Sequence, residues 1–198
     1  MKGLFHLMLL IALLSVLPIG ASAQTNLLIN SRADEGAISW RSSGKTSIED
    51  QNGNSVFVIR DNCLANFSQK VGIGEKDAAK FALLIGKGSS ERINPDGAIT
   101  GLPYLYGSML SSSSERGGTI SDYLQGQAML LNTKVADEWG TMYGIFPVPK
   151  GTVAIQFMLN QAERRGVPPN GSAARFDDLG LYLFDSREEA LKFIETYK

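Results

Sequence analysis

Carboxylates and aromatic rings are the side chains most able to carry chemistry here, because histidine and cysteine are nearly absent. The chain's only histidine is His6 and its only cysteine is Cys63. Beyond Ala23 the chain therefore excludes the Ser-His-Asp and Cys-His mechanisms and offers no imidazole ligand for zinc or copper. A single thiol forms no internal disulfide, so we interpret Cys63 as a small buried apolar residue.

The carboxylates that a glycan-cleaving enzyme could use are Glu49-Asp50 and Glu91. Such enzymes need one carboxyl group as acid and another as base or nucleophile. No acidic pair in the chain has a recognisable catalytic spacing. We therefore predict that the protein is not an enzyme.

Four aromatic residues are the candidate ligand-binding residues: Tyr104, Tyr106, Trp139 and Tyr143. Tyr104 and Tyr106 lie within residues 88–118, a segment rich in serine, glycine and proline that we expect to be a long loop. Loops on a rigid scaffold commonly contact ligands, and aromatic rings there stack on sugars or peptides. The alternative is that these tyrosines pack the loop onto the domain.

The N-terminal residues 1–23 have the organisation of a signal peptide. Lys2 precedes a short apolar run from Leu4 to Leu17, and the segment ends in Ala21-Ser-Ala23. The run is short for a membrane anchor, which is the alternative. We therefore expect a secreted, periplasmic or extracellular protein without a membrane span. With 19 basic and 20 acidic residues and a net charge of −1, nucleic acid is not an expected partner.

The apolar pattern predicts an all-β chain. From Ala174 to Phe184 both faces are apolar, which indicates a central strand. Asn52-Gly53 between two strand-like runs predicts a hairpin with a type I′ turn. Trp40 is expected in the core, although an exposed sugar platform is the alternative. About eight or nine strands predict a jelly-roll β-sandwich over residues 24–185. They are expected at 26–30, 45–50, 55–60, 67–71, 80–87, 127–132, 141–147, 152–159 and 174–184.

A short helix is expected within residues 186–198. Ser186 and Glu189 have the spacing of a capping box. The expected apolar face consists of Ala190, Leu191, Ile194 and Tyr197. We expect this face to dock on the sandwich, and the alternative is a tail that binds a partner protein.

Several segments resemble the galactose-binding-like jelly rolls, a superfamily that includes carbohydrate-binding modules and F-box-associated domains. The opening reads Asn26-Leu-Leu-Ile-Asn30, then Ala33-Asp-Glu-Gly36 and Trp40; Phe67-Ser-Gln69 resembles the next motif, and Phe176-Asp-Asp-Leu179 the closing strand. The F-box-associated branch shares the spacing of Trp139, Phe146, Pro149-Lys-Gly151 and Ile155-x-Phe157. Asp34 replaces the usual glutamate, and the long middle loop and terminal helix also depart from the pattern. The resemblance implies a sandwich that binds sugars.

The resemblance also implies a structural calcium ion, since carbohydrate-binding members often hold one between the opening segment and the closing acidic pair. Asp34, Asp177 and Asp178 would supply carboxylates, with oxygen atoms near Asn30 completing the site. The alternative is a hydrogen-bonding cluster that tethers the N-terminal segment.

The favoured hypothesis is a secreted, non-catalytic carbohydrate-binding domain whose partner is a glycan or another extracellular ligand. The alternative is an extracellular or cell-envelope domain that binds protein through a sheet face or the C-terminal helix.

Overall fold

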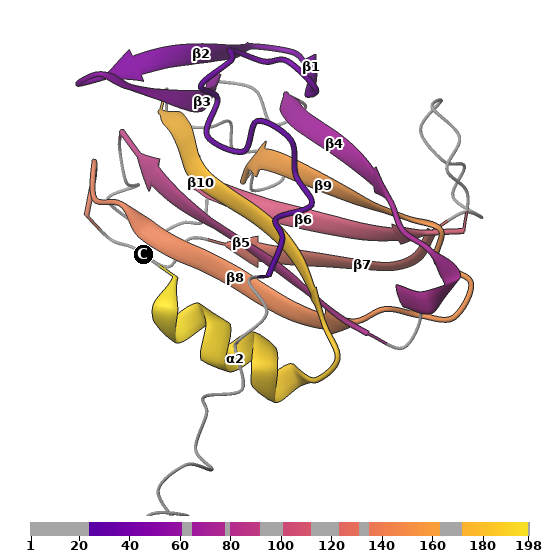
Figure 1. Cartoon of the computed structure of the whole chain (residues 1–198). Helices are drawn as coiled ribbons and strands as arrows, with labels where there is room; N and C mark the ends of the chain where they lie inside the picture. The colour runs from indigo at the N-terminus through magenta and orange to yellow at the C-terminus, as the bar shows by residue number, and fades with distance from the viewer. Residues whose placement is uncertain are drawn as a thin grey trace, which may run out of the picture.

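The chain folds into two five-stranded antiparallel sheets packed face to face (Figure 1). The computed structural model describes residues 24–60, 65–77, 80–91, 101–111, 123–130, 135–162 and 172–197. The expected signal peptide and Cys63 lie outside the described residues. The architecture is the predicted jelly-roll β-sandwich.

One sheet, called here the tyrosine sheet because it contains Tyr104 and Tyr106, has the order β1-β4-β9-β6-β7. Its strands are β1 (Arg41–Ser43), β4 (Asn66–Gly72), β6 (Pro103–Leu110), β7 (Tyr123–Leu130) and β9 (Ala154–Gln161). The other sheet, called the helix sheet because the C-terminal helix docks on it, has the order β2-β3-β10-β5-β8. Its strands are β2 (Thr46–Gln51), β3 (Asn54–Arg60), β5 (Phe81–Ser90), β8 (Gly140–Pro147) and β10 (Ala173–Phe184), and a short 3-10 helix, η1 (Glu75–Asp77), precedes β5. The central position predicted for the last strand is confirmed.

Aromatic rings from both sheets meet in the core. Trp40 is only 7% exposed, so its assignment to the core is confirmed. Its ring centroid lies 4.9 Å from that of Phe57 and 6.2 Å from that of Phe157. Trp40 Nε1 donates a hydrogen bond to the Asn30 carbonyl oxygen at 3.1 Å, which satisfies the only polar atom of the indole.

The predicted hairpin is formed by β2 and β3, with Gln51 paired to Asn54. Asn52 and Gly53 have φ angles of 59° and 85°. Two consecutive positive φ angles are the signature of a type I′ turn, so the turn prediction is confirmed.

Strand β10 contains a bulge between Asp177 and Gly180. Asp178 has a φ angle of 45° there. Phe176 and Leu179 are both buried in the core although they are three residues apart, which strict alternation along a strand would not allow. The extra residue resets the alternation and leaves Asp177 and Asp178 near the outer side.

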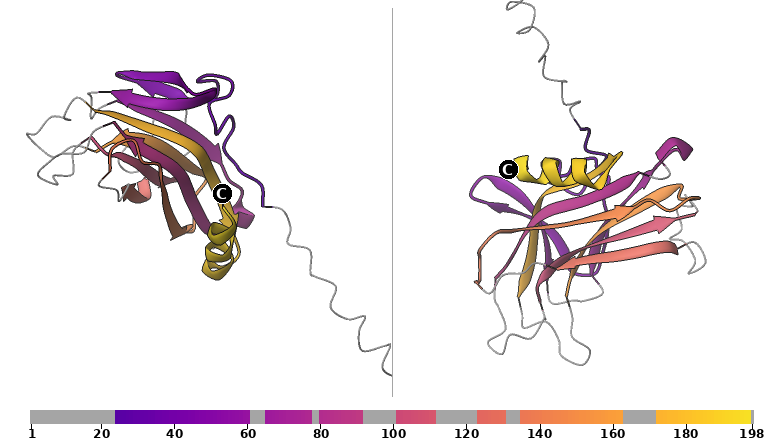
Figure 2. Two further views of the ribbon diagram at one scale, coloured as in Figure 1. Left: turned by 90° about the vertical axis from the view of Figure 1, so that its left-hand side faces the viewer. Right: turned by 90° about the horizontal axis from the view of Figure 1, so that it is seen from below.

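Helix α2 (Arg187–Thr196) lies against the outer face of the helix sheet (Figure 2). The Glu189 amide donates to Ser186 Oγ at 3.1 Å, as a capping serine requires. The predicted docking is confirmed, but the expected apolar face was wrong at Leu191, which is 37% exposed. Phe193 belongs to the docking face instead and packs on Tyr182. Residues three and four positions after Ala190 lie on the same face of the helix as Ala190. Within the described part of the chain, no helix is both long and apolar enough to span a membrane.

Two regions differ from the sequence-based expectation. Residues 26–30 form an irregular segment that ends in a bend instead of a strand, and the Leu27 amide and the Asn26 side chain tie it to β10. Residues 103–110 were expected in a loop but form β6. A proline is tolerated there because Pro103 is the first residue of the strand. With β6 and the three-residue β1 added, the described chain has ten strands.

Candidate functional site

The four candidate aromatic residues lie on opposite sides of the sandwich. Tyr104 and Tyr106 are in β6 of the tyrosine sheet, whereas Trp139 precedes β8 and Tyr143 lies within β8 of the helix sheet. The structure therefore does not bring them into one site. It defines two separate pairs, each on the outer side of its own sheet: Tyr104 and Tyr106 are half-buried, whereas Trp139 and Tyr143 are exposed.

The outer side of the tyrosine sheet, which we call the tyrosine face, combines aromatic and polar side chains. Leu105 of β6 and Phe157 of β9 point into the core, so the residues next to them in each strand point outward. Cross-strand pairing aligns these outward residues in rows. The rows are Tyr104, Asn160 and Asn66; Tyr106, Met158 and Ser68; and Ser108, Gln156 and Lys70.

Polar atoms on the tyrosine face lack hydrogen-bond partners within the described part of the chain. They are Ser108 Oγ, Gln156 Oε1 and Asn160 Nδ2. A shielded polar atom that makes no hydrogen bond costs about 1–3 kcal/mol. A ligand with many hydroxyl groups, or the water that it replaces, would supply the missing partners.

The second aromatic pair lies on the outer side of the helix sheet. Met142 is buried in the core, so its neighbour Tyr143 points outward and is 48% exposed. Trp139 is 37% exposed, unlike the buried Trp40. It lies beside the bulge of β10, where it lines a cleft together with Asp177 and Lys87.

The acidic pair of β10 is bound by other groups of the protein in this structure. Arg32 Nε lies 3.1 Å from Asp178 Oδ1, and Lys87 Nζ lies 2.7 Å from Asp178 Oδ2. Asp177 Oδ2 accepts from Asn54 Nδ2 at 2.8 Å, and burial raises the pKa of Asp177 although this hydrogen bond opposes the shift. Among the residues described, no three histidine, cysteine or carboxylate side chains are grouped as metal ligands would be.

The remaining candidate metal ligands are also engaged elsewhere or exposed. Asn30 Nδ2 donates to the carbonyl oxygens of Gly36 and Ile38, and its own carbonyl oxygen accepts from Trp40. Asp34 is exposed. These contacts match the alternative interpretation, a polar cluster that tethers the opening segment to β10.

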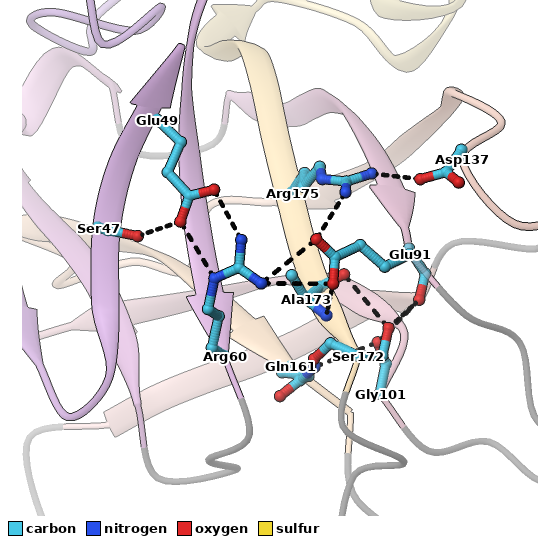
Figure 3. A network of polar contacts seen from close by, with 11 residues as sticks. Ser47, Glu49, Arg60, Glu91, Gly101, Asp137, Gln161, Ser172, Ala173 and Arg175 are labelled. Carbon is cyan, nitrogen blue, oxygen red and sulfur yellow. Dashed lines mark hydrogen bonds and ion pairs between the residues drawn. The ribbon is translucent and has the colours of Figure 1, made fainter. Parts of the chain in front are cut away.

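Two of the three carboxylates considered for catalysis, Glu49 and Glu91, belong to an ion-pair network across the helix sheet (Figure 3), whereas Asp50 accepts from the Gly53 amide at 3.1 Å in the hairpin turn. Glu49 accepts from Arg60 Nε at 3.1 Å and from Nη2 at 2.7 Å. These hydrogen bonds hold the pKa of Glu49 below its usual range. A general acid needs a raised pKa, so this environment is opposite to what acid catalysis requires.

The same network continues to the loop before β8. Glu91 Oε1 lies 3.3 Å from Arg60 Nη1 and 2.7 Å from Arg175 Nη2. Arg175 Nη1 in turn lies 2.5 Å from Asp137 Oδ1. The network thus links side chains of β2, β3 and β10, and Glu91 directly after β5, to Asp137, two positions before Trp139, as Figure 3 shows.

Sequence reasoning missed the amide residues of β9 and the arginines of the network. Gln156 and Asn160 alternate with the core residues of β9, so their outward position could have been predicted. Arg60 and Arg175 gave no such signal, because their partners come from other strands.

Comparison with known proteins shows the fold. No protein-family model matches the chain, and no curated protein does. Among solved structures, a family 16 carbohydrate-binding module superposes with a TM-score of 0.54 at 16% identity, covering 79% of this chain and 99% of that one. A family 61 module in complex with beta-1,4-galactotriose gives 0.52 at 18% identity, covering 82% and 99%. The CBM22-1 xylan-binding domain from Paenibacillus barcinonensis Xyn10C gives 0.52 at 14%, covering 84% and 99%. The chain therefore has the jelly-roll fold of carbohydrate-binding modules, and the predicted resemblance is confirmed at the level of the fold.

Proposed function

We propose that this protein is an exported, non-catalytic carbohydrate-binding domain that holds a glycan on the tyrosine face. The observation that carries the proposal is the position of Tyr104 and Tyr106 on one face of β6, beside outward amide groups of β9. Tyr104 and Tyr106 are half-buried. Aromatic rings beside amide groups suit sugar recognition, since a sugar presents apolar C–H faces and a rim of hydroxyl groups.

Four further features support the proposal. Unsatisfied polar atoms on the tyrosine face leave hydrogen bonds for a ligand to complete. The solved structures that share the fold include a xylan-binding domain and a module in complex with beta-1,4-galactotriose. The export of the protein rests on the leader-like residues 1–23, and its lack of catalysis rests on the arginine-bound state of Glu49 and Glu91.

The test is a glycan-array screen of the mature chain, followed by calorimetric titration with xylohexaose, beta-1,4-galactotriose and cellohexaose. Tyr106→Ala is expected to weaken the tyrosine-face affinity about tenfold, which corresponds to about 1.4 kcal/mol. Tyr143→Ala is the matched control, because it removes an exposed tyrosine from the opposite sheet. Equal affinities for both variants would contradict the placement of the glycan on the tyrosine face.

A screen without any binding, from a protein shown to be folded, would favour the protein-interaction alternative. The apolar face of the helix is not available to such a partner, because Phe193, Ile194 and Tyr197 already pack on the helix sheet. A partner protein would then be expected on the tyrosine face itself.

A further inference from the structure

A cleft of about 370 Å³ opens on the outer side of the helix sheet, beyond the part that α2 covers. Its walls come from the β2–β3 turn, from β5, from the start of β8 and from the bulge of β10. This volume falls in the range of about 300–1,000 Å³ that is common for small-ligand sites. The tertiary fold, not any single motif, creates it.

The side chains of the cleft suit a polyhydroxylated ligand. Asn52, Asn54 and Thr141 contribute amide and hydroxyl groups, which both donate and accept hydrogen bonds. Trp139 adds a partly exposed indole, an apolar surface of the size of a sugar ring. An aromatic surface next to neutral polar groups favours a ligand with C–H faces and hydroxyl edges.

The charges of the cleft are already compensated. Lys87 is paired with Asp178, which also binds Arg32 outside the cleft lining. A phosphate or a uronic acid would therefore have to break an ion pair to gain a cation. Asp177 is 7% exposed, and its Oδ1 atom has no hydrogen-bond donor in the described part of the chain. A hydroxyl group of a neutral ligand can donate to this oxygen without adding charge.

The segment that leads into Trp139 is held by the ion-pair network at Asp137. The Asp137 amide donates to the Ser90 carbonyl oxygen at 2.8 Å, and its carboxylate binds Arg175. Both contacts fix the segment that leads into Trp139 against the sheet. Backbone that is already fixed in this way loses little conformational entropy when a ligand stacks on the Trp139 ring.

We propose that the Trp139 cleft is a second saccharide-binding site, selective for neutral sugar units. It faces away from the tyrosine face, because the core lies between the two sheets. A protein with both sites filled therefore bridges two glycan chains and does not clamp one. The bridging rests on the proposed function of the tyrosine face, whereas sugar binding in the cleft does not.

Tryptophan fluorescence tests the cleft separately from the tyrosine face. The chain has two tryptophans, and Trp40 is buried, so acrylamide quenching reports mainly on Trp139. We expect xylohexaose, beta-1,4-galactotriose or cellohexaose to reduce the quenching, and an oligogalacturonate to leave it unchanged. The protection is expected to persist in Tyr106→Ala.

Thr141→Val tests the polar wall, because it keeps the shape of the side chain and removes one hydroxyl group. The affinity of the protecting oligosaccharide, measured from the quenching titration, is expected to fall about 3- to 10-fold, the usual effect of one lost hydrogen bond. Val135→Ala is the control, because Val135 is exposed and precedes Trp139 in the chain but does not line the cleft. The proposal is overturned if no neutral oligosaccharide protects Trp139, if the acidic one protects equally, or if Tyr106→Ala abolishes the protection.

Bridging is measured as turbidity of the soluble polysaccharide whose oligomer protects Trp139. Wild-type protein is expected to cross-link it, whereas Tyr106→Ala and Trp139→Ala are each expected to bind without turbidity. Protection of Trp139 without any turbidity would retain the cleft and overturn the bridging. Binding at the tyrosine face without protection of Trp139 would retain the proposed function and overturn the cleft.

Discussion

Lys87 donates a charge-assisted hydrogen bond to Asp178 across β5 and β10, with Nζ 2.7 Å from Oδ2. Arg32 binds the other oxygen of the same carboxylate. Two protein cations thus lie beside the carboxylate that the family resemblance assigned to calcium. Arg32 joins the opening segment to the closing strand, which is the mechanical role expected of such an ion, and Lys87 joins β5 to the same carboxylate.

This arrangement predicts that stability does not depend on calcium. Adding millimolar calcium or a chelator should leave the midpoint of thermal unfolding unchanged, because both oxygens of Asp178 are occupied. Lys87→Ala should lower the free energy of unfolding by up to about 1 kcal/mol, since the pair is partly exposed. A rise of the midpoint with calcium would show that the ion displaces these cations.

Gly107 is expected to tolerate no side chain. A Cβ atom there would lie 2.4 Å from Leu84 Cδ2, a fully buried atom of the opposite sheet. Gly107→Ala should therefore destabilise the protein by about 1–3 kcal/mol. Gly72→Ala is the matched control, because a Cβ atom there meets nothing within 4 Å. Equal urea-unfolding midpoints for the two variants would contradict the close packing of the sheets at this point.

Phe193 should anchor α2 to the helix sheet. Its ring centroid lies 4.6 Å from that of Tyr182 and 5.4 Å from that of Phe184. Phe193→Ala is expected to cost about 2–3 kcal/mol in urea unfolding, less than a fully buried ring would. Leu191→Ala, on the exposed side of the same helix, should change stability by less than about 0.5 kcal/mol. A larger effect at Leu191 would mean that the helix docks through another face.

Asp177 should make stability depend on pH. Burial raises its pKa above the ordinary value of 3.8, so the folded state holds the proton more tightly than the unfolded chain. The contribution of protonated Asp177 to the free energy of unfolding is fully present below pH 3.8 and is lost as the pH rises through the folded-state pKa. We therefore expect the difference in free energy of unfolding, Asp177→Asn minus parent, to be more positive at pH 7 than at pH 3.

Unfolding curves at both pH values check this expectation. Asp34→Asn removes the same charge from an exposed position and controls for the change in net charge. A difference between Asp177→Asn and the parent that stays constant with pH would refute the role of burial.

Much of the fold could be predicted because its signals are local. The alternation of apolar residues located β10, and Asn52-Gly53 located the hairpin. β6 was missed because glycine, serine and proline, which favour loops, outweighed its alternating leucine and tyrosine residues. The site was predicted less well, since its parts come from strands far apart in the chain.

The sequence by itself determined which residues alternate, where the hairpin turns and where the C-terminal helix begins, because each depends on neighbours within a few residues. Only the tertiary structure decided that Tyr104 and Trp139 face away from each other, because strand pairing sets which side of a sheet is buried. It also decided the partners of Asp178. The bulge in β10 shifts the alternation by one residue and brings this carboxylate to Lys87 and Arg32, which are distant in the chain.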